Sequence, residues 1–254
     1  MPLQKTDAIV LKSFRQGETS KILTLYSRAF GKIQVIAKGA RSTKSKFGGS
    51  LESYNYVSIV YYYKENRDLQ TLSQADIVQS FENSKQDLQK TTLSMAVCEL
   101  VNRLEHGAVP NPALFRLLID VLRAINMSRN PLHIFHAFEV HLSRIMGFAA
   151  NFQRCLKCEN QAPGKGAFDL RQGGYFCERC NTSESTGILL SEEALSALRR
   201  YQNSNLTNLN GFAISSSTES KLDEFLFAYL RYHNEGLREL NSLKFLKKLV
   251  VTDI

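Results

Sequence analysis

The sequence predicts an α+β protein with a small barrel of strands in its first third and helices in the rest. Short apolar runs that alternate at period two end near residue 80, and apolar residues at helical spacing begin near residue 84. A cluster of four cysteines interrupts the helical part. We therefore expect four segments, with the last packing on the second: residues 1–80, 81–150, 151–185 and 186–254.

The first segment contains five short runs that suit strands, separated by turn-forming sequences. In the third run, Ile33, Val35 and Ala37 fall on one face at period two. Five strands without a long helix favour a closed barrel of the OB-fold type, which often binds oligonucleotides. The runs cover residues 8–11, 22–26, 32–38, 54–63 and a stretch that begins at residue 69.

Helical patterns follow the predicted barrel. Pro131 suits the first turn of a helix that Gly147 would end. Ser191, followed by Glu192 and Glu193, suits the start of a further helix. Apolar residues recur at helical spacing in residues 88–104, 114–125, 131–146 and 222–233.

The formal net charge of +8 is concentrated at the start of the chain. Residues 1–50 hold ten basic and two acidic side chains, whereas the rest of the chain holds 22 of each. Such asymmetry is typical of proteins that bind an anionic polymer or lipid, although a solvated basic surface is the alternative. The candidate phosphate contacts are Arg15, Lys21, Lys38, Arg41, Lys44 and Lys46. The aromatic residues that could stack on bases, or instead fill the barrel, are Phe30, Phe47, Tyr54 and Tyr56.

Four of the five cysteines form two C-x2-C pairs, which is the strongest chemical signal in the chain: Cys155, Cys158, Cys177 and Cys180. Each pair aims two thiolates at one point, so two pairs can complete a closed, structural Zn²⁺ site. An iron–sulfur cluster and a redox pair are the alternatives. Turn-forming residues at 163–166 and 173–174 predict a β-hairpin between the pairs, and Cys98 is expected to be core.

Motifs of common catalytic sites are absent: the sequence has no P-loop, no G-x-S-x-G and no H-E-x-x-H. His133 and His136 have the spacing of a metal pair, but packing on a helix face is the simpler interpretation. We therefore expect a binding protein and not an enzyme. No apolar run approaches the roughly 18 residues of a membrane helix, and the first residues lack a signal-peptide pattern, so we expect a cytoplasmic protein.

The basic region resembles the N-terminal domain of the bacterial RecO family, and its most specific part is the sequence AKGAR at residues 37–41. The pair Gly147–Phe148, the four paired cysteines and the sequence SLKFL at residues 242–246 also resemble that family. The resemblance covers essentially the whole chain. Further matching segments of the basic region are residues 17–26, 30–33, 35–36 and 44–46.

The resemblance implies an OB-fold, a helical domain and a zinc finger in a recombination mediator that works at the nucleoid. Such proteins bind single- and double-stranded DNA and anneal complementary strands. With RecR, and sometimes RecF, they load RecA onto DNA coated by single-stranded-DNA-binding protein, whose acidic C-terminal tail they dock. An RNA- or ribosome-binding protein is the alternative, because OB barrels and zinc ribbons also serve there.

Overall fold

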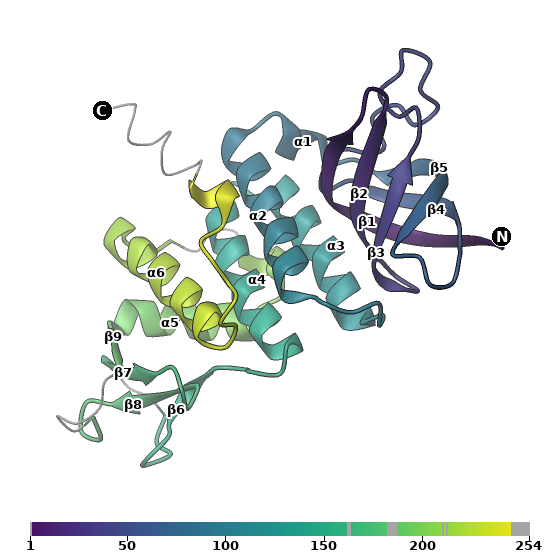
Figure 1. Ribbon diagram of the computed structural model, residues 1–254. Coiled ribbons are helices and arrows are strands. Elements are labelled where there is room, and N and C mark those ends of the chain that lie inside the picture. Colours follow the sequence, from purple (N-terminus) through teal and green to yellow (C-terminus); the bar gives the residue numbers. More distant parts are fainter. Residues whose placement is uncertain (1, 162–163, 182–186, 210, 212, 245–254) are drawn as a thin grey trace. The chain divides into compact units, whose positions relative to one another are not determined.

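A computed structural model describes residues 2–161, 164–181, 187–209, 211 and 213–244 (Figure 1). The chain forms two compact units, of which one comprises Met1–Met127 with Glu239–Ile254 and the other comprises Ser128–Arg238. The four segments predicted from the sequence stay a prediction, because a compact unit is not by itself an independently folding domain. Pro163 of the expected hairpin and the apolar, basic end of the chain from residue 245 lie outside the described residues.

The first unit contains the closed, five-stranded barrel that the sequence predicts. The strands follow one another in the order β1-β2-β3-β5-β4, and β4 pairs with β1 to close the ring. Neighbouring strands are antiparallel except β3 and β5, which are parallel, as in an OB-fold. The strands are β1 (Leu3–Gln16), β2 (Ser20–Ser27), β3 (Gly31–Ala37), β4 (Tyr56–Tyr62) and β5 (Leu69–Gln79).

Alternating side chains fill the barrel. Leu23 of β2 and Val35 of β3 are fully buried in its core, as the period-two pattern requires. Phe47 and Leu51 join the same core, although they lie in the connection from β3 to β4, residues 38–55. Burying each such side chain contributes about 1.5–3 kcal/mol, so this connection is anchored to the barrel.

Helices α1, α2 and α3 belong to the same unit, and polar side chains cap the first turns of two of them. The Asp87 carboxylate accepts a hydrogen bond from the Lys90 amide at 2.9 Å, and the Asn111 side-chain carbonyl accepts one from the Leu114 amide at 3.1 Å. Both bonds satisfy amides that have no partner within the helix. The helices are α1 (Glu82–Lys85), α2 (Leu88–Leu104) and α3 (Pro112–Met127).

Lys32, the second residue of β3, closes the C-terminal end of α2. Its ammonium group donates hydrogen bonds to the carbonyl oxygens of Asn102 at 2.6 Å and of Glu105 at 2.7 Å. These carbonyls lie at the negative end of the helix dipole and lack partners within the helix. Desolvation lowers the pKa of Lys32, against the attraction of the Glu105 carboxylate. One of the ten N-terminal cations therefore serves the fold and is unavailable to a ligand.

Gly31, next to Lys32, occupies a position that only glycine fits. Its φ is +61°, and an added Cβ would lie 2.6 Å from the carbonyl oxygen of Val109. We expect Gly31→Ala to lower the free energy of unfolding by about 2–4 kcal/mol. Gly17→Ala is the control, because Gly17 has φ +57° but open space around it, so it should lose only about 1 kcal/mol. Equal losses in urea unfolding would contradict the close contact with Val109.

The second unit combines helices with a four-stranded sheet in the order β6-β8-β7-β9. Strands β7 and β8 form an antiparallel hairpin, which confirms the hairpin predicted between the cysteine pairs. Helix α4 packs against α5 and α6. The elements are α4 (Pro131–Ile145), β6 (Asn151–Cys155), β7 (Gly166–Asp169), β8 (Gly174–Cys177), β9 (Ile188–Leu190), α5 (Glu192–Asn203), η1 (Leu206–Leu209) and α6 (Ser216–Tyr232).

The helix ends of this unit follow the capping residues in the sequence. Gly147 has φ +91°, and the Phe148 amide donates to the Ser143 carbonyl at 3.0 Å, which closes the end of α4 as expected. The Ser191 hydroxyl accepts a hydrogen bond from the Ala194 amide at 3.1 Å and starts α5. Nowhere in the described parts of the chain is a helix long and apolar enough to cross a membrane.

Candidate metal centre and nucleic-acid interface

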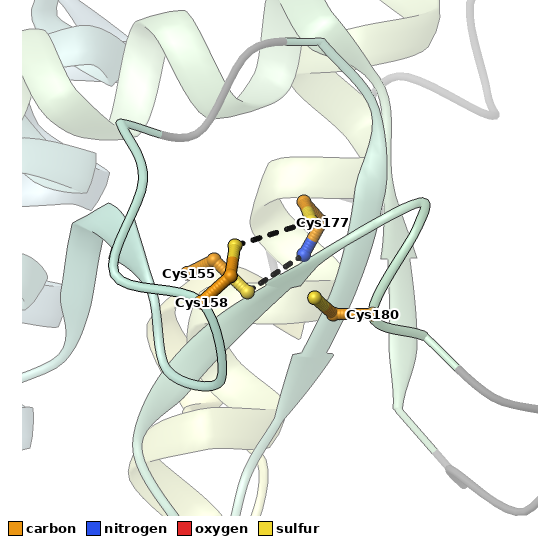
Figure 2. A group of neighbouring side chains, drawn as sticks. All are labelled: Cys155, Cys158, Cys177 and Cys180. Atoms are coloured by element: carbon orange, nitrogen blue, oxygen red, sulfur yellow. Dashed lines mark hydrogen bonds between the residues drawn. The ribbon is translucent and has the colours of Figure 1, made fainter.

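The four paired cysteines converge on one point (Figure 2), as their spacing predicts. Their sulfur atoms all lie within 4.8 Å of one another, and the Sγ atoms of Cys158 and Cys177 are 3.9 Å apart. Four sulfurs at about 2.3 Å from a central zinc ion are about 3.8 Å apart. Small side-chain movements therefore suffice to place all four around one metal ion.

Two neighbouring strands bring the pairs together. Strands β6 and β8 run parallel, so Cys155 and Cys177, their last residues, lie at the same edge of the sheet. The Cys177 amide donates a hydrogen bond to the Cys155 sulfur at 3.4 Å (Figure 2). Each strand then enters a tight turn that returns the second cysteine of the pair. In these turns the amide of Glu159 donates to the Cys155 carbonyl at 3.0 Å, and that of Cys180 donates to the Cys177 carbonyl at 2.9 Å.

The surroundings of the cysteine cluster shift the pKa values of Cys155 and Cys180 in opposite directions. Burial raises the pKa of Cys155, but the amides of Cys158, Cys177 and Lys157 outweigh burial and lower this pKa to about 6. Contact with the neighbouring thiols, that of Cys177 first, raises the pKa of Cys180 to about 12. A divalent cation offsets the repulsion among thiolates and so favours the fully ionised set. Four sulfur ligands leave no open position, which fits a structural metal site.

An aromatic cluster fixes the other end of the cysteine-bearing sheet. The Phe168 ring of β7 lies 5.3 Å from that of Phe152, 5.0 Å from that of Phe225 and 5.4 Å from that of Tyr229, measured between centroids. Phe225 and Tyr229 belong to α6, and all four residues are buried. The sheet therefore has an apolar anchor that the sequence does not reveal, in addition to any metal.

The histidine pair on α4 packs inside the second unit. His133 Nδ1 and the Tyr201 hydroxyl share a hydrogen bond of 2.6 Å, and His136 Nε2 and the Asp223 carboxylate share another of 2.6 Å. Both histidines are buried. Burial also raises the pKa of the Glu139 carboxyl well above its usual value, and Asp223 adds to this effect. The burial of both histidines and their hydrogen bonds to Tyr201 and Asp223 support the packing interpretation.

Four of the six candidate cations lie at the end of the barrel that carries the β1–β2 turn: Arg15, Lys21, Lys38 and Arg41. Arg15 and Lys21 lie directly opposite each other on these two strands. The connection from β3 to β4 carries the other four candidates, which are all exposed: Lys38, Arg41, Lys44 and Lys46. Lys21 pairs in register with Ala37, so the start of this connection adjoins the Arg15–Lys21 pair. The fold thus collects cations of two sequence segments at one end of the barrel.

Arg41 ties these two segments together. Its guanidinium donates hydrogen bonds to the carbonyl oxygens of Gly17 at 3.3 Å and Glu18 at 3.0 Å. Its amide donates to the Thr19 carbonyl at 2.8 Å. All three acceptors are neutral, so the positive charge of Arg41 remains available to a phosphate.

The nominated aromatic residues are mostly inside the fold. Phe47, Tyr54 and Tyr56 are buried, and Phe30 is half-buried against the barrel core. Bases cannot stack on a buried ring unless it moves, so the aromatic part of the expected interface stays a prediction. Phe14, which is not among the aromatic residues predicted to contact bases, has 43% of its surface exposed. Strand alternation alone does not identify it, because its neighbours in β1 are also partly exposed.

Comparison with known proteins gives one consistent result. Family models described as Recombination protein O N terminal and Recombination protein O C terminal match residues 1–81 and 85–244. The DNA repair protein RecO of Acetivibrio thermocellus is 31% identical over 247 residues, which is 96% of this chain and 96% of that protein. The proteins of the same name from Salinibacter ruber (31% identical, 90% and 87% covered) and Bacillus pumilus (28%, 98% and 97%) are similar over nearly their full lengths.

Proposed function

Because the chain belongs to the RecO family of DNA repair proteins, we propose that it is a mediator of recombinational repair that binds DNA and anneals complementary single strands. It acts by binding and not by catalysis, in the cytoplasm at the nucleoid. The family membership supports the repair role, and the charge distribution supports the DNA contact. No observation on the described residues favours the RNA- or ribosome-binding alternative.

The observation that carries the proposal is the gathering of cations at one end of an OB-fold barrel. Arg15, Lys21, Lys38, Lys44 and Lys46 form no ion pair with another described residue, so their charges are not neutralised within the described fold. A phosphate backbone releases counterions when such side chains bind it, which drives association without reading the base sequence. Annealing needs this kind of contact, because the bases must stay free to pair.

The proposed partners follow from the same family. With RecR, and in some settings RecF, the protein helps to load RecA onto DNA that single-stranded-DNA-binding protein covers. It docks the acidic C-terminal tail of that protein, for which a cationic and partly apolar surface is suitable. Double-stranded DNA is a further ligand of the same basic surface, because phosphate contacts do not require single strands.

We also propose that the metal held by the four paired cysteines is one structural Zn²⁺. The residues that would hold it are Cys155, Cys158, Cys177 and Cys180. An all-thiolate, tetrahedral donor set is typical of zinc in a reducing compartment. When bound, zinc would neutralise thiolate charge and join the turns after β6 and β8, and it would supply no reactive position.

The proposal predicts strand annealing without added nucleotide. Two complementary oligonucleotides precoated with single-stranded-DNA-binding protein should pair several-fold faster with the chain than without it, as followed by fluorescence energy transfer between end labels. RecR should be needed only for subsequent RecA loading. The same assay with RNA strands is the control for the alternative. Preference for RNA, or an annealing rate equal to that of coated strands alone, would contradict the proposal.

A further inference from the structure

A groove of about 400 Å³ lies in the first unit beside the cationic end of the barrel. Phe14 and Arg15 of β1 and Lys21 of β2 form one side of its lining. Tyr54, at the end of the β3–β4 connection, and Met95 of α2 also line it. The groove therefore combines an exposed ring, cations and apolar surface within one unit of the fold.

Two of the positive charges that line this groove have no acidic partner among the described residues. Arg15 and Lys21 are directly opposite on adjacent antiparallel strands, where like charges destabilise a sheet. Neither side chain forms an ion pair or hydrogen bond with any other described residue. A third cation of the lining, Lys85, is already paired with Glu52 at 3.0 Å and with Glu82 at 3.6 Å. The uncompensated charge therefore belongs to Arg15 and Lys21, and an external anion would relieve their repulsion.

Two further features of the groove, one in a side chain and one in the backbone, favour a ligand site. Phe14 is 43% exposed, although a phenylalanine ring gains free energy by burial, and the Lys12 ammonium group lies 5.7 Å from the centroid of its ring. Tyr54 has φ +55°, a left-handed conformation that costs about 1–2 kcal/mol for a residue other than glycine. Its amide bonds the Val10 carbonyl at 2.8 Å, which holds this conformation in place. Strained backbone of this kind concentrates at ligand sites.

We propose that this groove binds an unpaired nucleotide, with its base stacked on Phe14 and its flanking phosphates on Arg15 and Lys21. The inference rests on the proposed binding of single-stranded DNA and adds the residue that distinguishes single strands from duplex. A base in a double helix is already stacked on both faces, so only an unpaired base is free to stack on the Phe14 ring. The contact is independent of sequence, because every base has an aromatic face.

The sequence contains no tryptophan, so the fluorescence of a tryptophan introduced at position 14 can report the stacking of a base directly. In the Phe14→Trp variant, the introduced indole is the sole tryptophan, and we expect a saturating oligo-dT to quench its emission. An abasic oligonucleotide of equal charge should bind without quenching. Tyr62→Trp is the matched control, because Tyr62 is 40% exposed but pairs with Leu3 at the opposite end of β1. Unchanged Phe14→Trp emission, or equal quenching by the abasic strand, would overturn the inference.

Affinity gives a second and independent readout. Phe14→Ala should weaken binding of oligo-dT about tenfold and leave duplex binding and the salt dependence unchanged, since no phosphate contact is lost. Phe14→Tyr should restore affinity, and circular dichroism checks that each variant folds. An equal loss on duplex would overturn the inference, and so would quenching of the Phe14→Trp variant by an acidic peptide but not by oligo-dT. If the parent chain binds oligo-dT with steep salt dependence and replacement of Phe14 changes neither the affinity nor the quenching, only this inference fails. If the parent chain does not bind DNA, the proposed function itself fails.

Discussion

Replacement of Cys177 by serine is expected to abolish stoichiometric metal binding and to loosen the sheet β6–β9. Cys177 ends β8, and its amide also bonds the Cys155 sulfur, so the substitution removes a ligand at the point where both turns meet. Metal binding to such a site contributes about 10–16 kcal/mol in isolated zinc-finger peptides, where it acts as folding free energy. The effect here should be smaller, because the cluster around Phe168 anchors the far end of the sheet.

Hydrogen exchange and metal analysis measure these effects together. We expect one zinc per parent chain and none in the Cys177→Ser variant. Amides of β8 should exchange at least about 1000-fold faster in the variant, equivalent to roughly 4 kcal/mol, while α4 keeps its protection. Cys98→Ala is the control, since Cys98 is buried in the first unit and should leave the metal content unchanged. Metal-free, freshly reduced parent protein with a protected β8 would contradict the zinc proposal.

The barrel could be predicted from the sequence because each strand encodes its own buried face. Ile33, Val35 and Ala37 alternate, and the turns between runs carry glycine or charged residues. The cysteine centre was equally predictable, because C-x2-C spacing constrains the geometry of the turn that carries it. In both cases the information is local, and the fold has only to bring compatible segments together.

Features that depend on distant contacts were not predictable. Strands β6 and β9 are short and lie at the ends of their sheet, where pairing with β8 and β7 rather than sequence pattern defines them. Lys32 looks like any other N-terminal cation until α2 places two carbonyls beside it. The sequence left open whether Phe47 stacks on bases or fills the barrel, and the structure places it in the barrel core, in a connection that has no regular periodicity. Long-range packing decides each of these outcomes.

The Lys38/Arg41/Lys44→Ala variant is expected to lose most of the salt dependence of single-stranded DNA binding. If about five phosphates are neutralised by the parent chain, log K should fall with log salt at a slope of about −3.5. Three lost contacts should reduce this slope to about −1.4. Between 0.05 and 0.2 M salt, the parent should thus lose about 100-fold in affinity and the variant only about sevenfold. Little dependence on base sequence is expected in either protein.

Two further variants separate phosphate contact from other effects of the substitutions. Arg41 also joins the β3–β4 connection to the β1–β2 turn by hydrogen bonds. The Lys38/Lys44→Ala variant therefore removes only the two cations that form no such bond in the described fold. The slope of log K against log salt for this variant should be about −2.1. Lys5/Lys64/Arg67→Ala removes the same charge as the triple variant from exposed positions at the other end of β1 and in the β4–β5 connection. Its slope should stay near −3.5, because these side chains lie away from the gathered cations. An unchanged slope in the Lys38/Arg41/Lys44→Ala variant, or an equal reduction in this control, would move the DNA contact away from the basic end of the barrel.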